Sequence, residues 1–261
     1  MRSLNVSVIQ DALSWQDPAA NRQRYDEHFD SLDDNDQKTD LIVLPETFST
    51  GFTMSPWEAC EYMEGDTVLW MKQRSQELGA VITGSLIVKL DESYVNRMIW
   101  AKPDGGMVFY DKRHLFRFGG EHLHYTSGDK RVVVDINGWR VALFICYDLR
   151  FPVWSRNRGD YDIGIYVANW PVVRQYAWDT LIKARAIENQ AYVLASNRLG
   201  SDPVGNAYRG GSAILDFMGK PIVDCEDKVM IANTSLSMEP LSTFREEFPA
   251  GMDCDEFEIR A

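Results

Sequence analysis

The stretch "VALFICYDLRFPVWSR", residues 141–156, joins an apolar run, Val141–Ile145, directly to a cysteine and then to polar residues. Such a run predicts a strand that is buried on both faces, as the strands of layered α/β folds are. The strand ends at Cys146, and Tyr147 and Asp148 follow at once. The thiol is therefore either a small core residue or a nucleophile at the mouth of a cleft, and the rest of the sequence has to distinguish the two.

Strand-like segments, each bounded by turn residues, recur along the whole chain. Two junctions carry hairpin signals: Pro103–Gly106 in "KPDGGM" and Asn137–Gly138 in "DINGWR", where a type I′ turn requires positive φ at both central residues. The predicted strands are 4–10, 40–48, 80–88, 97–103, 106–112, 131–136, 139–148, 162–169, 191–197, 212–217 and 220–226.

Helical patterns interrupt the strands. Asp17 is suited to cap a helix that begins at Pro18, Asp66 is a second candidate cap, and Gly79 is suited to end the helix that follows it. The predicted helices are 18–33, 66–78 and 175–190.

The mixture of helical crossovers and tight hairpins predicts mixed sheets, and the fully apolar strands need cover on both faces. We therefore expect a layered α/β sandwich, in which two sheets pack together and helices lie outside. The sequence contains no internal repeat, low-complexity tract or Gly/Ser linker, so residues 1–261 are expected to form a single domain.

Composition excludes several classes of function. Apolar residues make up 45% and charged residues 25% of the 261 residues, which is typical of a globular protein with a full core. The formal net charge of -12 argues against nucleic acid or an anionic membrane as a partner, because both require a positive face. The N-terminus lacks a long apolar run, and no segment approaches the length that spans a bilayer, so we expect a cytoplasmic protein.

The four cysteines, Cys60, Cys146, Cys225 and Cys254, are far apart and form no C-x-x-C pair. This spacing predicts neither a zinc site nor a redox dithiol, and the thiols should be reduced in the cytoplasm. We expect no metal and no cofactor.

Three predicted strands end on a reactive side chain. Glu46 follows "LIVLP", Lys112 follows "VFYD", and Cys146 follows "VALFI". Functional side chains converge at strand ends in layered α/β folds. Together the three suit acyl transfer: a carboxylate takes the thiol proton, and an ammonium stabilises the oxyanion together with the backbone N–H of Tyr147.

The ordered motifs "LPETF", "YDKRHLF" and "ICYDLRFPVWSR", followed by "YDIGIYVANWP" and "ARAIENQAYVLASNR", resemble those of the nitrilase superfamily of carbon-nitrogen hydrolases. The resemblance covers nearly the whole chain. It implies a four-layer αββα sandwich, with Glu46 as general base, Lys112 as oxyanion stabiliser and Cys146 as nucleophile. It also implies a second glutamate after the lysine, for which "RFGGEHLHYTSGD" offers Glu121.

Within the superfamily the motifs most closely resemble the omega-amidase branch. The implied substrates are small-molecule ω-amides of short 2-oxo dicarboxylic acids, such as 2-oxoglutaramate. By the same resemblance, Asn169 and Trp170 should border the acyl pocket, and the protein should be a homodimer. A substrate carboxylate needs a cationic partner, for which the candidates are Arg117, Arg150, Arg174 and Arg198.

Other interpretations remain open. His114, His122 and His124 lie near the lysine motif and could form a Cys-His dyad or a metal site, although we expect them to line or support the loop that carries Glu121. Asp148 and Arg150 could form a simple ion pair beside the thiol.

Other functions on the same fold also remain open. Another amidase of the superfamily, a nitrilase or a carbamoyl-amide hydrolase would use the same catalytic residues. A non-catalytic member of the fold would bind a small carboxylate or a protein, but it would not need Glu46, Lys112 and Cys146 together.

Overall fold

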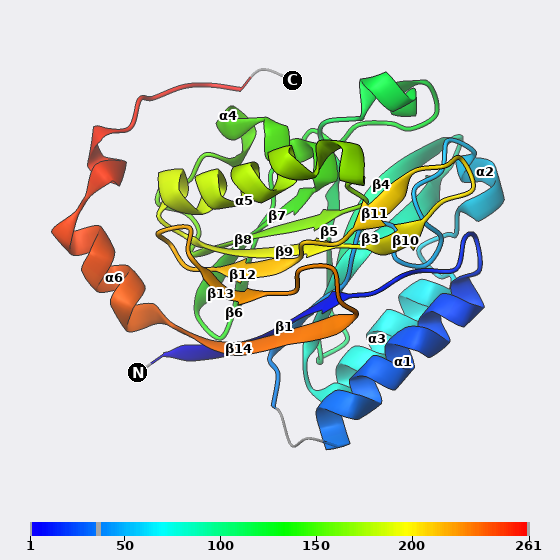
Figure 1. Cartoon of the computed structure of the whole chain (residues 1–261), viewed down its shortest axis with the longest axis horizontal. Coiled ribbons are helices and arrows are strands. Elements are labelled where there is room, and N and C mark those ends of the chain that lie inside the picture. Colours follow the sequence, from blue (N-terminus) through cyan, green and yellow to red (C-terminus); the bar gives the residue numbers. More distant parts are fainter. Residues whose placement is uncertain (1, 35–37, 260–261) are drawn as a thin grey trace.

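A computed structural model describes residues 2–34 and 38–259 of the chain. Within these ranges, two six-stranded mixed sheets form the centre of the molecule (Figure 1). The first sheet has the order β14-β1-β2-β3-β4-β5 and the second β13-β12-β9-β8-β7-β6. The strands of the first sheet are β1 (Ser3–Gln10), β2 (Leu41–Val43), β3 (Val81–Leu90), β4 (Ser93–Ala101), β5 (Met107–Asp111) and β14 (Met230–Ser237). Those of the second are β6 (Val133–Ile136), β7 (Trp139–Ile145), β8 (Ile163–Ala168), β9 (Tyr192–Asn197), β12 (Ala213–Leu215) and β13 (Pro221–Asp224).

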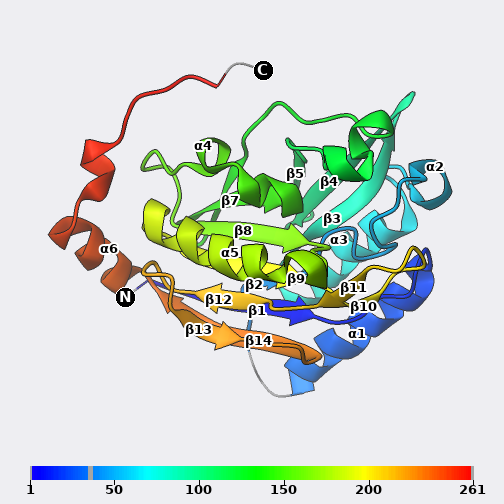
Figure 2. The same cartoon turned by 45° about the horizontal axis from the view of Figure 1, so that its top comes forward.

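Helices cover the outer faces of both sheets. The helices α1 (Pro18–Asp34) and α3 (Asp66–Leu78) lie side by side on the first sheet, and α5 (Gln175–Asn189) lies on the second (Figures 1 and 2). The remaining helices are α2 (Pro56–Ala59), α4 (Pro152–Ser155) and α6 (Met238–Glu247). The architecture is therefore the expected αββα sandwich.

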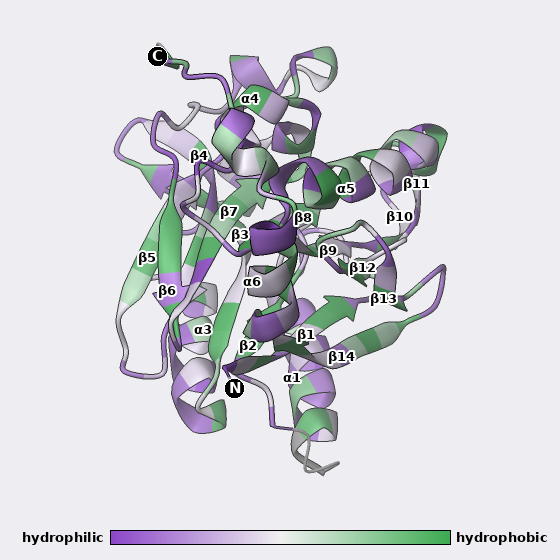
Figure 3. Cartoon of the chain, turned by 90° about the vertical axis from the view of Figure 1, so that its left-hand side faces the viewer, coloured by the Kyte–Doolittle hydropathy of each residue, from purple (hydrophilic) through white to green (hydrophobic). Residues whose placement is uncertain are grey.

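The alternation of side chains along the strands divides the core into two parts. In β2, Val43 belongs to the cluster between the sheets, whereas its neighbour Ile42 packs with Tyr25 and Phe29 of α1. This is the period of two that a strand with both faces covered requires. Figure 3 shows that the interior strands are largely apolar, whereas α6, in the middle of that view, carries many hydrophilic residues.

Most of the local predictions are confirmed. The two hairpins form at the expected places, and Asn137 and Gly138 have φ of 51° and 76°. The carboxylate of Asp17 accepts a hydrogen bond from Ala20 N at 3.0 Å, so it caps α1, and Gly79 ends α3 with a φ of 63°.

Three local predictions are wrong or incomplete. Asp66 is not the cap of α3: Gly65 occupies that position, and the carboxylate of Glu61 accepts a hydrogen bond from Thr67 N instead. Strand β14 and helix α6 were not predicted. Neither was the hairpin of β10 (Leu199–Ser201) and β11 (Ala207–Arg209), which leaves the second sheet between β9 and β12.

No helix within the described ranges is both long and apolar enough to cross a membrane.

The segment after β2 lies close against β3 because Gly84 has no side chain. A Cβ atom at Gly84 would lie 2.9 Å from both Leu44 Cβ and Phe48 Cδ1. The backbone N–H groups of Leu44 and Phe48 also donate to carbonyls of β3, Thr83 O and Ser85 O. The position of the residues between Leu44 and Phe48 is thus set by this contact.

Replacing Gly84 with Val should lower the free energy of unfolding by about 1–3 kcal/mol, because the new side chain overpacks a closed contact. Urea unfolding followed by fluorescence measures the loss. The matched control is Gly251→Ala, since a Cβ there meets open space and its φ is not positive. If the two variants unfold at the same urea concentration, the close packing at Gly84 is not what holds this segment.

Candidate active site

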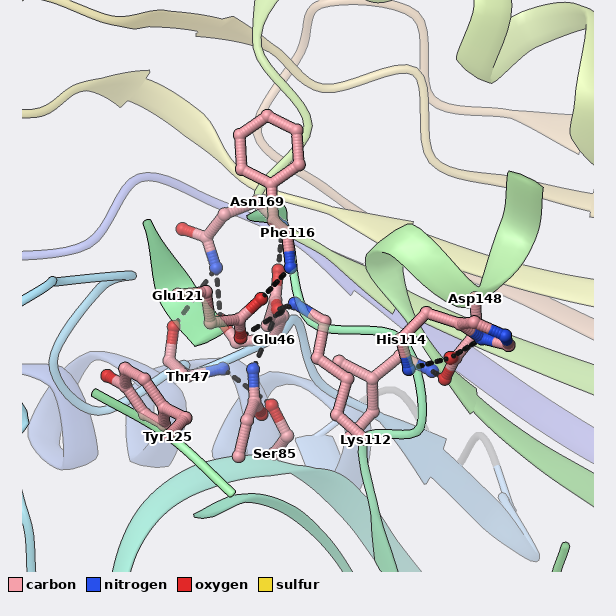
Figure 4. Close-up of polar contacts among 12 residues, drawn as sticks. Glu46, Thr47, Ser85, Lys112, His114, Phe116, Glu121, Tyr125, Asp148 and Asn169 are labelled. Carbon is pink, nitrogen blue, oxygen red and sulfur yellow. Dashed lines mark hydrogen bonds and ion pairs between the residues drawn. The ribbon is translucent and has the colours of Figure 1, made fainter. Parts of the chain in front are cut away.

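A cavity of ≈ 390 Å³ lies at the ends of β5, β7 and β8, the strands that precede Lys112, Cys146 and Asn169. The sequence-predicted residues that line it are Lys112, Cys146, Tyr147, Arg150, Asn169, Trp170 and Arg174. Glu46 and Glu121 are fully buried, and each accepts a hydrogen bond from Lys112. The structure therefore brings all of these residues to one place, and Figure 4 shows Glu46, Lys112, Glu121 and Asn169 among them.

Glu46 is held by donors from three different segments. Its Oε1 accepts hydrogen bonds from Asn96 Nδ2 at 2.8 Å and Lys112 Nζ at 2.9 Å, and its Oε2 accepts one from Asn169 N at 2.7 Å. The amide Nδ2 of Asn169 also donates to Glu46 O at 2.6 Å. A carboxylate with this many donors has one fixed orientation, which a positioned base requires.

Lys112 is the buried cation between two carboxylates. Its Nζ lies 2.9 Å from Glu46 Oε1 and 3.0 Å from Glu121 Oε1, and it lies 4.8 Å from the centre of the Phe52 ring. The second oxygen of Glu121 accepts a hydrogen bond from Phe116 N. Glu121 is carried by the 3-10 turn η2 (Glu121–Leu123), so this loop is tied to the strand end at Lys112.

Burial and the neighbouring opposite charge shift the pKa of Lys112, and likewise that of Glu121, in opposite directions. Burial alone would lower the pKa of Lys112, but the Glu121 and Glu46 carboxylates outweigh it and hold that pKa well above its usual value. Burial raises the pKa of Glu121 in spite of the ammonium beside it. Lys112 therefore stays charged at neutral pH.

Cys146 begins the 3-10 turn η3 (Cys146–Arg150) directly after β7, in a strained conformation with a φ of 44°. Burial, and then the charge of Glu46, raise the pKa of the Cys146 thiol well above its usual value, and Lys112 opposes them. The free thiol is therefore protonated at rest and needs a nearby acceptor to become nucleophilic. Glu46 is such an acceptor.

The family model for carbon-nitrogen hydrolases matches residues 5–241. This chain belongs to the carbon-nitrogen hydrolase family.

Relatives of this carbon-nitrogen hydrolase include amidases. The chain is 46% identical to omega-amidase YafV of Yersinia enterocolitica over 98% of this chain and 99% of that protein. It is 29% identical to the 2-oxoglutaramate amidase of Bacillus subtilis over 94% and 95% of the two chains. The crystal structure of XC1258 from Xanthomonas campestris, a CN-hydrolase superfamily protein with an arsenic adduct in its active site, has a TM-score of 0.96 and 44% identity over the whole of both chains.

The arginines differ in their access to the cavity of this carbon-nitrogen hydrolase. Arg150 and Arg174 line it, and each guanidinium stacks on an aromatic ring: Arg150 lies 4.9 Å from the centre of Trp170 and Arg174 lies 5.1 Å from that of Phe116. Neither forms an ion pair with a carboxylate in the described part of the chain. Both are therefore available to an anion in the cavity.

The other two candidate arginines are not on the cavity wall. Arg117 lies on the exposed turn η1 (Arg117–Gly119). Arg198 is 1% exposed and donates hydrogen bonds to the carbonyls of Leu199 and Ser201.

The possible ion pair between Asp148 and Arg150 does not form. Asp148 is buried and instead contacts His114, whose Nδ1 lies 2.8 Å from Asp148 Oδ1. His124 packs against Trp57, with ring centres 5.8 Å apart. Across residues 2–34 and 38–259 no group of three or more His, Cys, Asp or Glu side chains is arranged to hold a metal ion.

Several residues of the site are not among those predicted from the sequence. Asn96 lies inside β4, whereas Glu46, to which it donates a hydrogen bond, follows β2. No local sequence pattern identifies Asn96 as a residue of the site. The β10–β11 hairpin contributes Asp202, Val204, Asn206 and Tyr208 to the cavity wall. The signal for it was the turn-rich stretch "GSDPVGN", residues 200–206, which is typical of a hairpin loop.

Replacing Lys112 with Met should cost about 3–5 kcal/mol of unfolding free energy at pH 8, because it leaves Glu46 and Glu121 buried without a cation. The pKa of Glu121 is already raised and should rise further in the variant. A carboxyl group whose folded pKa exceeds its unfolded pKa stabilises the fold at low pH and loses that contribution as pH rises. The loss should therefore be smaller at pH 5 than at pH 8 in urea unfolding.

The control is Lys228→Met, which removes an exposed lysine from a surface pair with Glu226. Its stability should follow that of the wild type at both pH values. An equal loss for Lys112→Met at pH 5 and pH 8 would mean that the two carboxylates do not depend on the ammonium.

Proposed function

We propose that this carbon-nitrogen hydrolase is an omega-amidase that hydrolyses the terminal amide of short 2-oxo dicarboxylic acid monoamides, such as 2-oxoglutaramate, to the dicarboxylate and ammonia. The observation that carries the proposal is the fixed carboxylate of Glu46 beside a protonated thiol, Cys146, in a cavity that also presents two unpaired guanidinium groups. The full-length similarity to YafV and to 2-oxoglutaramate amidase supports the same substrate class.

The proposed first half-reaction forms a thioester. Glu46 takes the thiol proton of Cys146, and the thiolate attacks the amide carbon. The ammonium of Lys112 and the backbone N–H of Tyr147 stabilise the negative charge that develops on the carbonyl oxygen. As the tetrahedral intermediate collapses, the C–N bond breaks and the proton on Glu46 passes to the nitrogen, so that ammonia leaves.

The second half-reaction uses the same groups in reverse order. A water molecule gives a proton to Glu46 and attacks the thioester carbon. The C–S bond then breaks, the proton on Glu46 passes to the sulfur to regenerate the thiol, and the acid is released. Glu121 keeps Lys112 in place during both steps through its 3.0 Å contact with the ammonium.

The remaining cavity residues suit the two ends of the substrate. Arg150 and Arg174 can pair with its carboxylate. Asn169 Oδ1 is buried and has no hydrogen-bond partner in the residues described, so it can accept an N–H of the substrate amide. Trp170, which lies under Arg150, forms an apolar wall for the short acyl chain.

We also propose that residues 1–261 fold as one domain and that the protein is a cytoplasmic homodimer. Large apolar side chains are exposed at Phe118, which lines the cavity, and at Val173 and Tyr176, which lie within two residues of Arg174 in sequence; their exposed fractions are 87%, 80% and 85%. Burial of such side chains between two subunits is favourable.

Replacing Cys146 with Ala should abolish ammonia release from 2-oxoglutaramate, and Glu46→Gln should reduce kcat by at least about 100-fold, because a positioned base is lost. Steady-state assays of ammonia release measure both. Intact-mass spectrometry of the wild type during turnover should detect an acyl adduct that is absent from Cys146→Ala.

The matched controls are Cys60→Ala, a free thiol away from the cavity, and His122→Ala and His124→Ala. These variants should keep most of the activity. Turnover by Cys146→Ala at the wild-type rate would refute the nucleophile assignment, and equal losses for Glu46→Gln and His122→Ala would support a histidine base instead.

Replacing Arg150 or Arg174 with Met should lower kcat/KM for 2-oxoglutaramate by roughly 10–100-fold, the magnitude expected for a hydrogen bond to a charged group. Activity toward an uncharged amide of similar length should change little. The control is Arg117→Met. Equal losses on the charged and the uncharged amide would show that the arginines support the fold of the cavity and do not bind the carboxylate.

A further inference from the structure

Asp148 is a fully buried carboxylate with four polar contacts, three of which are hydrogen bonds that it accepts. Its Oδ1 accepts from His114 N at 3.0 Å and contacts His114 Nδ1 at 2.8 Å. Its Oδ2 accepts from the Tyr110 hydroxyl at 2.6 Å and from Ile145 N at 3.0 Å. Asp148 has no ion pair with lysine or arginine within the described ranges, so its partners are hydrogen-bond donors and one imidazole.

The donors are placed around two residues of the proposed mechanism. Tyr110 is two residues before Lys112, and His114 is two residues after it. Ile145 immediately precedes Cys146. A single carboxylate therefore bonds both sides of the lysine and the backbone at the cysteine, as Figure 4 shows for its contact with His114.

We propose that Asp148 is a positioning residue that fixes the thiol of Cys146 relative to the ammonium of Lys112. Neither side chain is held to the other by a long rigid element, because one follows β5 in the first sheet and the other follows β7 in the second. The hydrogen bonds of Asp148 link these two strand ends directly. This inference rests on the proposed roles of Lys112 and Cys146.

The conformation of Cys146 makes such a link necessary. A non-glycine residue with a φ of 44° persists only where its surroundings hold it. Asp148 is on the same 3-10 turn and bonds back to the N–H of Ile145, which closes the turn around Cys146. If Asp148 were lost, the backbone at Cys146 could relax and carry the thiol away from its partners.

The donors are themselves held from a second side. The His114 ring stacks on Phe151, with ring centres 3.7 Å apart and planes 8° from parallel. The indole Nε1 of Trp154 donates to the Tyr110 hydroxyl at 3.0 Å. Phe151 and Trp154 follow Cys146 on the same segment, so the link between the two strand ends is double.

The test is Asp148→Asn, which replaces one of the two carboxylate oxygens with an NH2 group. That group cannot accept the hydrogen bonds that the lost oxygen accepted. We expect kcat/KM for ammonia release from 2-oxoglutaramate to fall by about 100-fold, since a misplacement of reacting groups by about 1 Å has effects of this size. The affinity for the dicarboxylate product, measured by calorimetry, should stay within about threefold, because the change displaces the thiol and leaves the arginines in place.

The matched control is Asp162→Asn. Asp162 is also a buried carboxylate with several donors, but it binds Arg140 and Arg245 beyond the other end of β8. It should lose thermal stability while its kcat/KM stays near the wild-type value. Equal losses of kcat/KM in the two variants would overturn the positioning role and leave Asp148 with a role in stability alone.

A second measurement does not depend on the substrate. The rate at which iodoacetamide alkylates Cys146, followed by peptide mass, should fall about tenfold in Asp148→Asn and not in Asp162→Asn. An unchanged alkylation rate in Asp148→Asn overturns the proposal. If the wild type releases no ammonia from 2-oxoglutaramate, the proposed function fails, and the alkylation rates still decide the role of Asp148.

Tyr110→Phe keeps the proposal testable if Asp148→Asn does not fold. It removes one donor to Asp148 without leaving a buried charge unpaired, and its alkylation rate and kcat/KM should each fall by about threefold to tenfold. Wild-type values for both in a folded Tyr110→Phe variant would contradict the proposal.

Discussion

The buried ammonium of Lys112 is the interaction on which the site depends. Two carboxylates, Glu46 and Glu121, are almost inaccessible to water, and burial of either would be costly without a cation. Glu46 belongs to the segment after β2 in the first sheet, and it also accepts a hydrogen bond from Asn169, which follows β8 in the second sheet. One charge cluster thus connects both sheets, so a change in how the two sheets pack would alter the geometry of the site.

The layers of the fold could be predicted from the sequence because the interior strands have a clear apolar pattern. "LIVLP" and "VALFI" are apolar on both faces, and only a position between two covered layers satisfies them. β14 has no such signal: "MIANTSLS" mixes small, polar and apolar residues, because it is an edge strand that pairs with β1 alone. α6 is equally hard to predict, since only Leu241 among its residues is fully buried.

The site was predictable to the extent that its residues follow buried strands. Glu46, Lys112 and Cys146 each follow a predicted strand, so their convergence at one edge of the fold could be inferred from the sequence. The partners of Asp148 could not be predicted in this way. Proximity in sequence favours Arg150, whereas the fold places His114 and Tyr110 beside Asp148 instead. The β10–β11 hairpin resembles an ordinary surface loop in sequence, and only its tertiary position makes it a wall of the cavity.

The charge cluster has a consequence for what leaves the cavity. Two carboxyl groups and a single ammonium lie together beside the thiol, so the cluster has no positive charge to spare for a second anion. A primary amide is neutral and meets little opposition there, whereas the acid formed from it at neutral pH is an anion that Glu46 repels. The arrangement that keeps Lys112 in place thus discriminates between an amide and its own hydrolysis product, and it opposes inhibition by the acid as that acid accumulates.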